Sequence, residues 1–284
     1  MKPVPFDYAR PETLEEALAL MANYGDDAAP LAGGLSLGPM LNLRLARPAV
    51  VVDLGRLALH EIDSLSPDRP VETGALVRQA FLQQRLKADL IMPLVGEALD
   101  CIGHYQTRAR GTVGGSVAHA DPAAELPLCL VTMDGSVWLQ STAGRRNVPA
   151  TAFFEAALTT ARHPDELVAG LEWPDAGEPG TAFAEFALRH GDFAIVAAAA
   201  IVRRNDDGRV SGIRLGLGGV EDAPRVFVGS DDAVNNFKDF VEQSMAVLRP
   251  TDDPVCDAPY RLALARKLGL AVIVRALERA GLHP

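Results

Sequence analysis

Apolar residues in the first part of the chain follow helical spacing in one segment and short, strand-like runs in others. Thr13 and Glu16 match a capping box, after which apolar residues recur every three or four positions. This pattern predicts a helix from residue 14 to about residue 23. Apolar runs predict short strands at residues 29–34 and 50–54, and the segment between them is typical of a turn or a short helix.

The middle of the chain alternates between segments with helical spacing of apolar residues and segments with strand-like apolar runs. The pattern predicts strands and turns at 60–76, helices at 79–90 and 93–103, a β-hairpin at 136–150 and a strand at 167–173. A stretch rich in proline and glycine, WPDAGEPG at residues 173–180, then interrupts the pattern. Such stretches are typical of connections, so we expect a domain boundary here.

Beyond this connection the chain reads as a smaller unit of mixed type. The most apolar run of the sequence extends from Phe193 to Val202, and alternation at 209–220 predicts a further strand. Residues 260–281 have helical periodicity and end in glycine. The last hundred residues therefore predict a small α+β domain.

Composition narrows the class of protein. The chain has 284 residues, a net charge of −10 and a pI of about 5.1. A nucleic-acid binder needs a basic face, so that class is disfavoured. The apolar run of about ten residues is half the length of a membrane span, and the start has no apolar core of signal-peptide length. We expect a cytoplasmic protein.

The three cysteines limit the redox chemistry that the chain itself can perform. Cys101, Cys129 and Cys256 have no CxxC spacing. An iron–sulfur cluster held only by cysteine takes four thiolates, so this chain alone cannot hold one. We expect buried structural thiols. The scattered histidines provide no metal-binding spacing, and no nucleophile–base motif is present, so we predict no catalytic residue and no metal ligand in this chain.

Two glycine-rich segments are the strongest chemical signal. GGLS at residues 33–36 and GTVGGS at residues 111–116 both place paired glycines beside a hydroxyl residue. Glycine permits positive φ and close approach, so successive N–H groups can converge on an anion. Ordinary turns use the same residues. Neither GxxxxGK[ST] nor a GxGxxG motif that opens a helix is present.

Two carboxylates follow the second segment. Asp121 and Glu125 lie in HADPAAELP, just downstream of the paired glycines. Carboxylates there are suited to accept hydrogen bonds from the hydroxyls of a cofactor sugar. The alternative is that Asp121 caps a helix that starts at Pro122, with Glu125 in its first turn. The sequence leaves both readings open, and one residue can do both.

Four segments together resemble a known family. They are AGGLSLGPMLNLRLARPAVVVDL, RARGTVGGSVAHADPAAELP, FALRHGDFAIV and DDPVCDAPYRLALARKLGLAVIVRAL, which follow one another over nearly the whole chain. The chain resembles the FAD-binding medium subunit of molybdenum hydroxylases, the group of carbon monoxide, xanthine, nicotine and quinoline dehydrogenases. The resemblance implies an α+β fold with two FAD-binding subdomains, of the PCMH or vanillyl-alcohol-oxidase type. A C-terminal α+β domain with a three-stranded sheet would follow. The implied boundaries are 1–57, 58–174 and 175–284.

The resemblance also implies a flavin site. Backbone N–H groups of two loops would bind the FAD diphosphate. The residues of these loops are Ala32, Gly33, Gly34, Leu35 and Ser36 in the first and Thr112, Val113, Gly114, Gly115 and Ser116 in the second. Glu125 would hydrogen-bond ribityl or ribose hydroxyls, and Asp121 would order the loop or contact the cofactor. Asp192 and Phe193 would lie near the isoalloxazine, where Phe193 either stacks on the ring or is a core aromatic.

The chain departs from the family pattern at three places. Leu35 replaces a residue that is usually polar, which removes a side-chain contact and leaves the backbone unchanged. Residues 107–110 read Thr-Arg-Ala-Arg in place of Ile-Arg-Asn-Arg, which affects the packing of the second loop. Residues 226–236 differ from the family's alanine-rich text, which we expect to affect only a surface segment.

The function implied by the resemblance is electron transfer. The chain would receive electrons from two [2Fe–2S] clusters on a small partner subunit and pass them through FAD to an acceptor. A large subunit with the molybdenum cofactor would hydroxylate the substrate, and the complex would be a heterohexamer with two copies of each chain. Two alternatives remain open: a stand-alone FAD-dependent oxidoreductase and a scaffold subunit that has lost the flavin.

Overall fold

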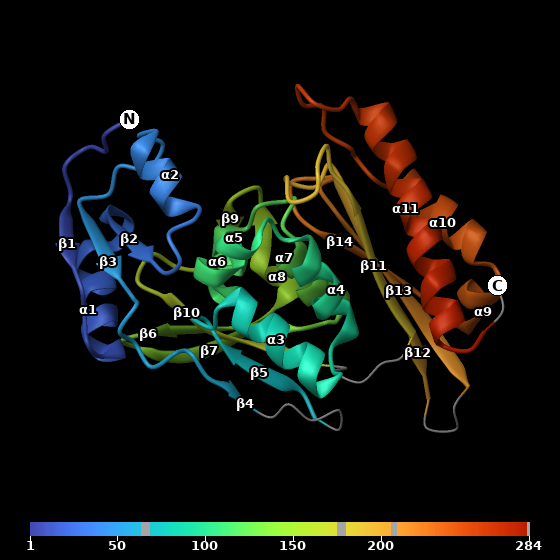
Figure 1. Ribbon diagram of the computed structural model, residues 1–284, viewed down its shortest axis with the longest axis horizontal. Helices are drawn as coiled ribbons and strands as arrows, with labels where there is room; N and C mark the ends of the chain where they lie inside the picture. Colours follow the sequence, from blue (N-terminus) through green and yellow to red (C-terminus); the bar gives the residue numbers. More distant parts are fainter. Residues whose placement is uncertain (64–68, 175–179, 206–208, 283–284) are drawn as a thin grey trace.

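The computed structural model describes residues 1–63, 69–174, 180–205 and 209–282 (Figure 1). Its first sheet is parallel and has the strand order β1-β3-β2. These strands are β1 (Asp7–Ala9), β2 (Ala28–Leu31) and β3 (Val50–Asp53). The expected strand that ends in the first glycine loop is β2. The loop leads into helix α2 (Leu37–Asn42), which confirms the short-helix reading of that segment.

Helix α1 (Leu14–Tyr24) packs on this first sheet, one residue longer than predicted at its C-terminal end. The Thr13 hydroxyl accepts a hydrogen bond from the Glu16 N–H at 3.2 Å, as the capping box predicts. The Glu16 carboxylate itself accepts from the Glu12 N–H. The buried face of α1 joins the apolar side chains of β3 in one cluster. A single turn of 3₁₀ helix, Gly25–Asp27, connects α1 to β2.

A second, antiparallel sheet has five strands in the order β4-β5-β10-β6-β7. The strands are β4 (Ile62–Asp63), β5 (Val71–Gly74), β10 (Leu167–Trp173), β6 (Ser136–Ser141) and β7 (Gly144–Pro149). The predicted hairpin is β6-β7, and the predicted strand at 167–173 is β10. Residues 64–68 of the segment 60–76, where strands and turns were expected, lie outside the described residues.

A layer of helices lies between the second sheet and the C-terminal sheet (Figure 1). Its elements are α3 (Gln79–Asp89), α4 (Pro93–Cys101), α5 (Tyr105–Arg110), α6 (Val113–His119), α7 (Glu125–Thr132) and α8 (Ala150–Phe153), followed by the small pair β8 (Phe154–Ala156) and β9 (Thr159–Thr160). All eight residues of α7 are buried. A helix that is apolar on all sides belongs in the interior, and α7 packs against α4, α6 and strands β12 and β13.

The C-terminal sheet is antiparallel and has four strands, so the expectation of three is wrong. The strands are β11 (Gly180–Phe186), β12 (Val196–Arg204), β13 (Val210–Gly218) and β14 (Arg225–Gly229). The additional strand β14 includes part of the segment whose text departs from the family. It is an edge strand that pairs only with β13, and its side chains are half-buried or exposed. An edge strand with little buried surface leaves a weak sequence pattern.

Strand β12 explains the apolar run that the sequence contains. Ala197, Ala199 and Ile201 face the cluster around α7, whereas Ala198 and Ala200 face the cluster under the C-terminal helices. A strand buried on both faces is apolar at every position. Helices α9 (Asp231–Asn235), α10 (Phe237–Ala246) and α11 (Ala258–Arg279) cover the outer face (Figure 1). In the described part of the chain, no helix is long and apolar enough to cross a membrane.

Residues 175–179 of the predicted boundary segment lie outside the described residues. The elements on its two sides still contact each other, because α4 and α7 pack against strands of the C-terminal sheet. Buried Arg214 on β13 donates from Nε to the Thr132 carbonyl at 2.7 Å, at the end of α7. The N- and C-terminal parts therefore share an interface, formed by α4, α7 and strands of the C-terminal sheet.

Candidate functional site

The first glycine loop connects β2 to α2 and touches the second loop through Gly33. A Cβ atom at Gly33 would overlap the backbone carbonyl of Arg110 and would lie 3.1 Å from the Cα atom of Gly111. Gly34, the next residue, has φ +77°, which favours glycine. The structure thus brings together the two glycine segments, which lie far apart in the sequence, and explains why the first position of the pair has no side chain.

Backbone donors of the first loop have no internal partner. Among the described residues, no acceptor receives a hydrogen bond from the N–H groups of Gly33, Gly34, Leu35 or Ser36. Gly33 is buried, and buried N–H groups are almost always paired in proteins. Four consecutive donors without a protein acceptor are a fitting complement for a bound anion.

The second loop is built differently. The Gly115 N–H donates to the Thr112 hydroxyl at 3.0 Å, and the Ser116 N–H donates to the Thr112 carbonyl at 3.2 Å, which caps α6. The N–H groups of Val113 and Gly114 donate to carbonyls of the segment that follows β5, each at 2.9 Å. These four donors are therefore already engaged within the protein. The second loop contributes its small residues and its contact with the first loop instead.

Paired glycines in the second loop allow that close packing. A Cβ atom at Gly114 would lie 2.5 Å from the Cβ atom of Ala75. A Cβ atom at Gly115 would lie 2.5 Å from the Thr112 hydroxyl oxygen and 3.8 Å from the Cβ atom of Ala32. Ala32 belongs to the first loop, so the two loops meet at this second point as well.

Asp121 orders the turn that leads into α7. Its carboxylate accepts from the Ala123 N–H at 2.9 Å, and its carbonyl accepts from the Ala124 N–H at 3.0 Å. Helix α7 begins at Glu125 and not at Pro122, so the alternative of a helix that starts at the proline is wrong. Asp121 forms a local turn because its short carboxylate reaches a backbone donor two residues on.

Glu125, in the first turn of α7, is a buried carboxyl group. Its side chain is 8% exposed, and among the described residues no other side chain bonds to it. Burial raises the pKa of Glu125 to about 8, with a smaller upward contribution from Glu185 and Asp121, while its own backbone N–H opposes the shift. Burial also raises the pKa of Glu185, on β11, to about 7. Glu125 thus offers a buried carboxyl group that no other side chain among the described residues engages.

The GDF triplet lies in the connection between β11 and β12. Phe193 is 76% exposed, so the reading of Phe193 as a core aromatic is wrong. The adjacent Gly191, with φ +87°, packs against the connection between α4 and α5, and a Cβ atom there would lie 3.0 Å from Cε1 of His104. The rings of His104 and His190 lie 6.3 Å apart between centroids. Asp192 and Phe193 are thus held near the segment that leads through α5 to the second glycine loop.

Two arginines at the junction of the loops were not predicted as site residues. An Nη1 donor of Arg78 bonds to the Arg110 carbonyl, the same oxygen that abuts Gly33. Arg78 also forms an isolated β-bridge with Thr112. Burial lowers the pKa of Arg78, and the neighbouring Arg110 charge lowers it further. The R-A-R triplet immediately before the second glycine loop was a sequence signal for Arg110, and Arg78 lies outside it.

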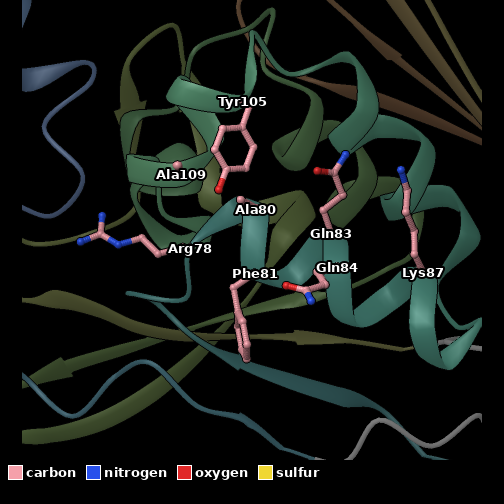
Figure 2. A pocket seen from close by; sticks show the side chains of 8 residues that line it. All are labelled: Arg78, Ala80, Phe81, Gln83, Gln84, Lys87, Tyr105 and Ala109. Carbon is pink, nitrogen blue, oxygen red and sulfur yellow. The ribbon is translucent and has the colours of Figure 1, made fainter.

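A surface groove of about 420 Å³ lies beside this junction, between α3 and α5 (Figure 2). Its lining residues are Arg78, Ala80, Phe81, Gln83, Gln84, Lys87, Tyr105 and Ala109. No predicted site residue lines the groove. In the described part of the chain, no group of three or more histidine, cysteine, aspartate or glutamate side chains is arranged to hold a metal ion.

Comparison with known proteins assigns the N-terminal and the C-terminal part of the chain to described domain families. Residues 4–176 match the family described as the FAD binding domain in molybdopterin dehydrogenase, and residues 181–276 match the CO dehydrogenase flavoprotein C-terminal domain. The chain is 36% identical to the alpha subunit of the 6-hydroxypseudooxynicotine dehydrogenase complex of Paenarthrobacter nicotinovorans, over 99% of this chain and 97% of that protein.

Solved structures have the same fold over the whole length. Quinoline 2-oxidoreductase from Pseudomonas putida 86 contains a chain with a TM-score of 0.89 and 32% identity, with 99% of each chain covered. A chain of carbon monoxide dehydrogenase from Hydrogenophaga pseudoflava has a TM-score of 0.89 and 30% identity, covering 98% of this chain and 99% of that one. These matches confirm the family resemblance and the α+β FAD-binding fold. The chain therefore belongs to the molybdopterin dehydrogenases, as their FAD-binding medium subunit.

Proposed function

We propose that the two glycine loops hold the diphosphate of FAD. The observation that carries this assignment is the row of four N–H donors in the first loop, which have no acceptor among the described residues. The contact of Gly33 with the Arg110 carbonyl fixes this row beside the second loop. Thr112 to Ser116 line the site with small residues, and the N–H groups of Val113 to Ser116 stay engaged in the protein.

The sugar and ring portions of FAD follow from the other site residues. Glu125 accepts hydrogen bonds from ribityl or ribose hydroxyls, which supply partners that no other side chain among the described residues gives its buried carboxyl group. Asp121 keeps the turn before Glu125 in place. Phe193 stacks on the isoalloxazine, which accounts for the exposure of a large aromatic side chain, and Asp192 lies beside it.

The chain acts as an electron carrier within a larger enzyme. Bound FAD supplies the redox chemistry, and the residues of this chain bind it, orient it and limit its access to water. The small partner subunit delivers electrons from its [2Fe–2S] clusters, and the large subunit binds the substrate at its molybdenum cofactor. We place the complex in the cytoplasm as a heterohexamer, and we assign the three domains of this chain to residues 1–57, 58–174 and 175–284.

Native purification of the chain with an affinity tag tests this function. We expect FAD at about one per chain, and two co-purifying subunits that carry molybdenum and about four irons per FAD. FAD and turnover without partners would favour a stand-alone oxidoreductase instead. Partners with a colourless chain that does not rebind FAD would favour a scaffold subunit.

A further inference from the structure

Arg78 and Arg110 place two positive charges at the junction of the glycine loops. Arg78 lies in the segment that follows β5 and is half-buried. Arg110 is the last residue of α5 and is exposed. Arg78 bonds to the Arg110 carbonyl, and this oxygen lies against Gly33. One carbonyl group therefore separates the Arg78 guanidinium from the loop whose four N–H donors have no protein acceptor.

These charges have little compensation within the protein. Among the described residues, no carboxylate pairs with either arginine. Asp53 is close enough to influence the pKa of Arg78, but its own bonds go to the Tyr8 hydroxyl and the Gly55 N–H, and it forms an ion pair with Arg10. Arg78 and Arg110 repel each other, which contributes to the lowered pKa of Arg78. Two neighbouring cations without a carboxylate, in a chain of net charge −10, point to an anionic ligand.

The direction of Arg78 agrees with a ligand on the loop side. Figure 2 shows its guanidinium pointing away from Phe81 and Tyr105, which line the groove between α3 and α5. A guanidinium has five N–H donors in a planar fork that suits phosphate oxygens, and only one bond of Arg78 is made within the described part of the protein.

We propose that Arg78 and Arg110 bind the diphosphate of FAD beside the first glycine loop, so that the site selects FAD over uncharged flavins. This inference rests on the proposed function. The N–H groups of the first loop recognise the shape of the anion, and the two guanidinium groups neutralise its two negative charges. Arg78 also positions the second loop through its bond to the Arg110 carbonyl.

The test compares two flavins on the full-length chain after its own flavin has been removed. FAD carries the diphosphate, whereas riboflavin is uncharged. The affinity for both flavins depends on the ring site, but only the affinity for FAD depends on contacts to the diphosphate. Dissociation constants are measured by quenching of flavin fluorescence at several KCl concentrations. The variants are Arg78→Gln, Arg78→Lys and Arg110→Gln. The control is Arg85→Gln, which removes an exposed charge on α3 whose ion pair among the described residues is with Asp89.

We expect Arg78→Gln and Arg110→Gln to weaken FAD binding by about tenfold or more each, because each removes a charge-assisted contact. Riboflavin binding should change less than about twofold, and the salt dependence of FAD binding should become shallower. Arg110→Gln is informative even if Arg78→Gln misfolds, since the Arg110 side chain bonds to no described residue. Arg78→Lys should retain part of the affinity for FAD.

Equal losses for FAD and riboflavin would overturn the inference, because they would mean that the arginines only support the loops. Unchanged FAD binding in both glutamine variants would overturn it as well. Failure of the unsubstituted chain to bind FAD would contradict the proposed function itself, which keeps the two outcomes distinct.

Discussion

Gly33 occupies a position where a side chain would meet backbone atoms of another segment. A Cβ atom there would overlap the Arg110 carbonyl. Because this carbonyl belongs to the backbone, the overlap can be relieved only if the two loops move apart. We expect Gly33→Val to lower the FAD content of the purified chain at least tenfold and to destabilise it by about 1–3 kcal/mol. Absorbance of bound flavin and urea unfolding measure the two effects.

Gly38 provides a matched control for this substitution. It lies in α2, five residues further along the same segment, and a Cβ atom there meets nothing within 4 Å. Gly38→Ala should keep the flavin and stabilise the chain by about 0.5–1 kcal/mol, because alanine loses less entropy in a helix. Full flavin content in Gly33→Val would contradict the assigned role of the loop contact.

Glu125 gives the flavin-free chain a pH-dependent stability. Burial raises its pKa to about 8 in the folded chain, against about 4.5 in the unfolded chain. Between these values the unfolded chain loses the proton more readily, so the free energy of unfolding falls as pH rises from about 4.5 to about 8. Glu125→Gln removes this loss and should stabilise the chain at pH 9 by on the order of 2–4 kcal/mol more than at pH 4.5.

Urea unfolding of the flavin-free chain at the two pH values measures this difference. Glu155→Gln, at an exposed position of β8, is the control and should leave the pH dependence of the unfolding free energy unchanged. If Glu125→Gln changed the free energy of unfolding equally at both pH values, the pKa of Glu125 would not be raised in the folded chain.

At the scale of whole elements, Arg261 fastens the C-terminal helix α11 to the sheet. Its side chain is 3% exposed and donates to the carbonyls of Ile195 and Gly219, each at 2.7 Å, and of Thr251 at 2.9 Å. It also bonds to Asp253. The D-D and Y-R parts of the family-like C-terminal segment therefore meet in one ion pair, in which Arg261 is buried and Asp253 is exposed.

Replacement of Arg261 by methionine should destabilise the chain by about 3–5 kcal/mol, because it leaves the carbonyls of Ile195, Gly219 and Thr251 without their hydrogen-bond donor. Arg266→Gln on the same helix removes only an exposed pair with Glu242 and should cost less than about 1 kcal/mol. Denaturation midpoints of the two variants make the comparison. Similar losses would show that α11 is held by its apolar face alone.

Local signals account for the elements that the sequence predicted well. The capping box at Thr13 and the β6-β7 hairpin both depend on neighbours within a few residues. Helix α6 was read as part of a loop, since its paired glycines have low helix propensity. The capping bonds of Thr112 and the packing of Gly114 on Ala75 stabilise it instead. Such distant contacts leave no periodic pattern in the sequence.

At the scale of the whole molecule, the family resemblance predicted the fold and the membership of a larger enzyme, which composition and periodicity alone did not reach. The resemblance did not reveal how the two glycine loops divide their work. The engaged donors of Val113 and Gly114 depend on carbonyls next to β5, which a motif does not display. The roles assigned to the site residues and the three domain boundaries stay predictions.

The contact between Gly33 and Arg110 has a consequence for the order of events in the cell. The first loop leaves the ribosome well before Arg110, against which it packs. The strand β5 lies beside the second loop and pairs with β10, which is translated only near residue 170. A nascent chain that has only completed its first sheet therefore lacks the second loop of the proposed diphosphate site. We expect FAD capture only after more than half of the chain has been translated, as a late step of biogenesis.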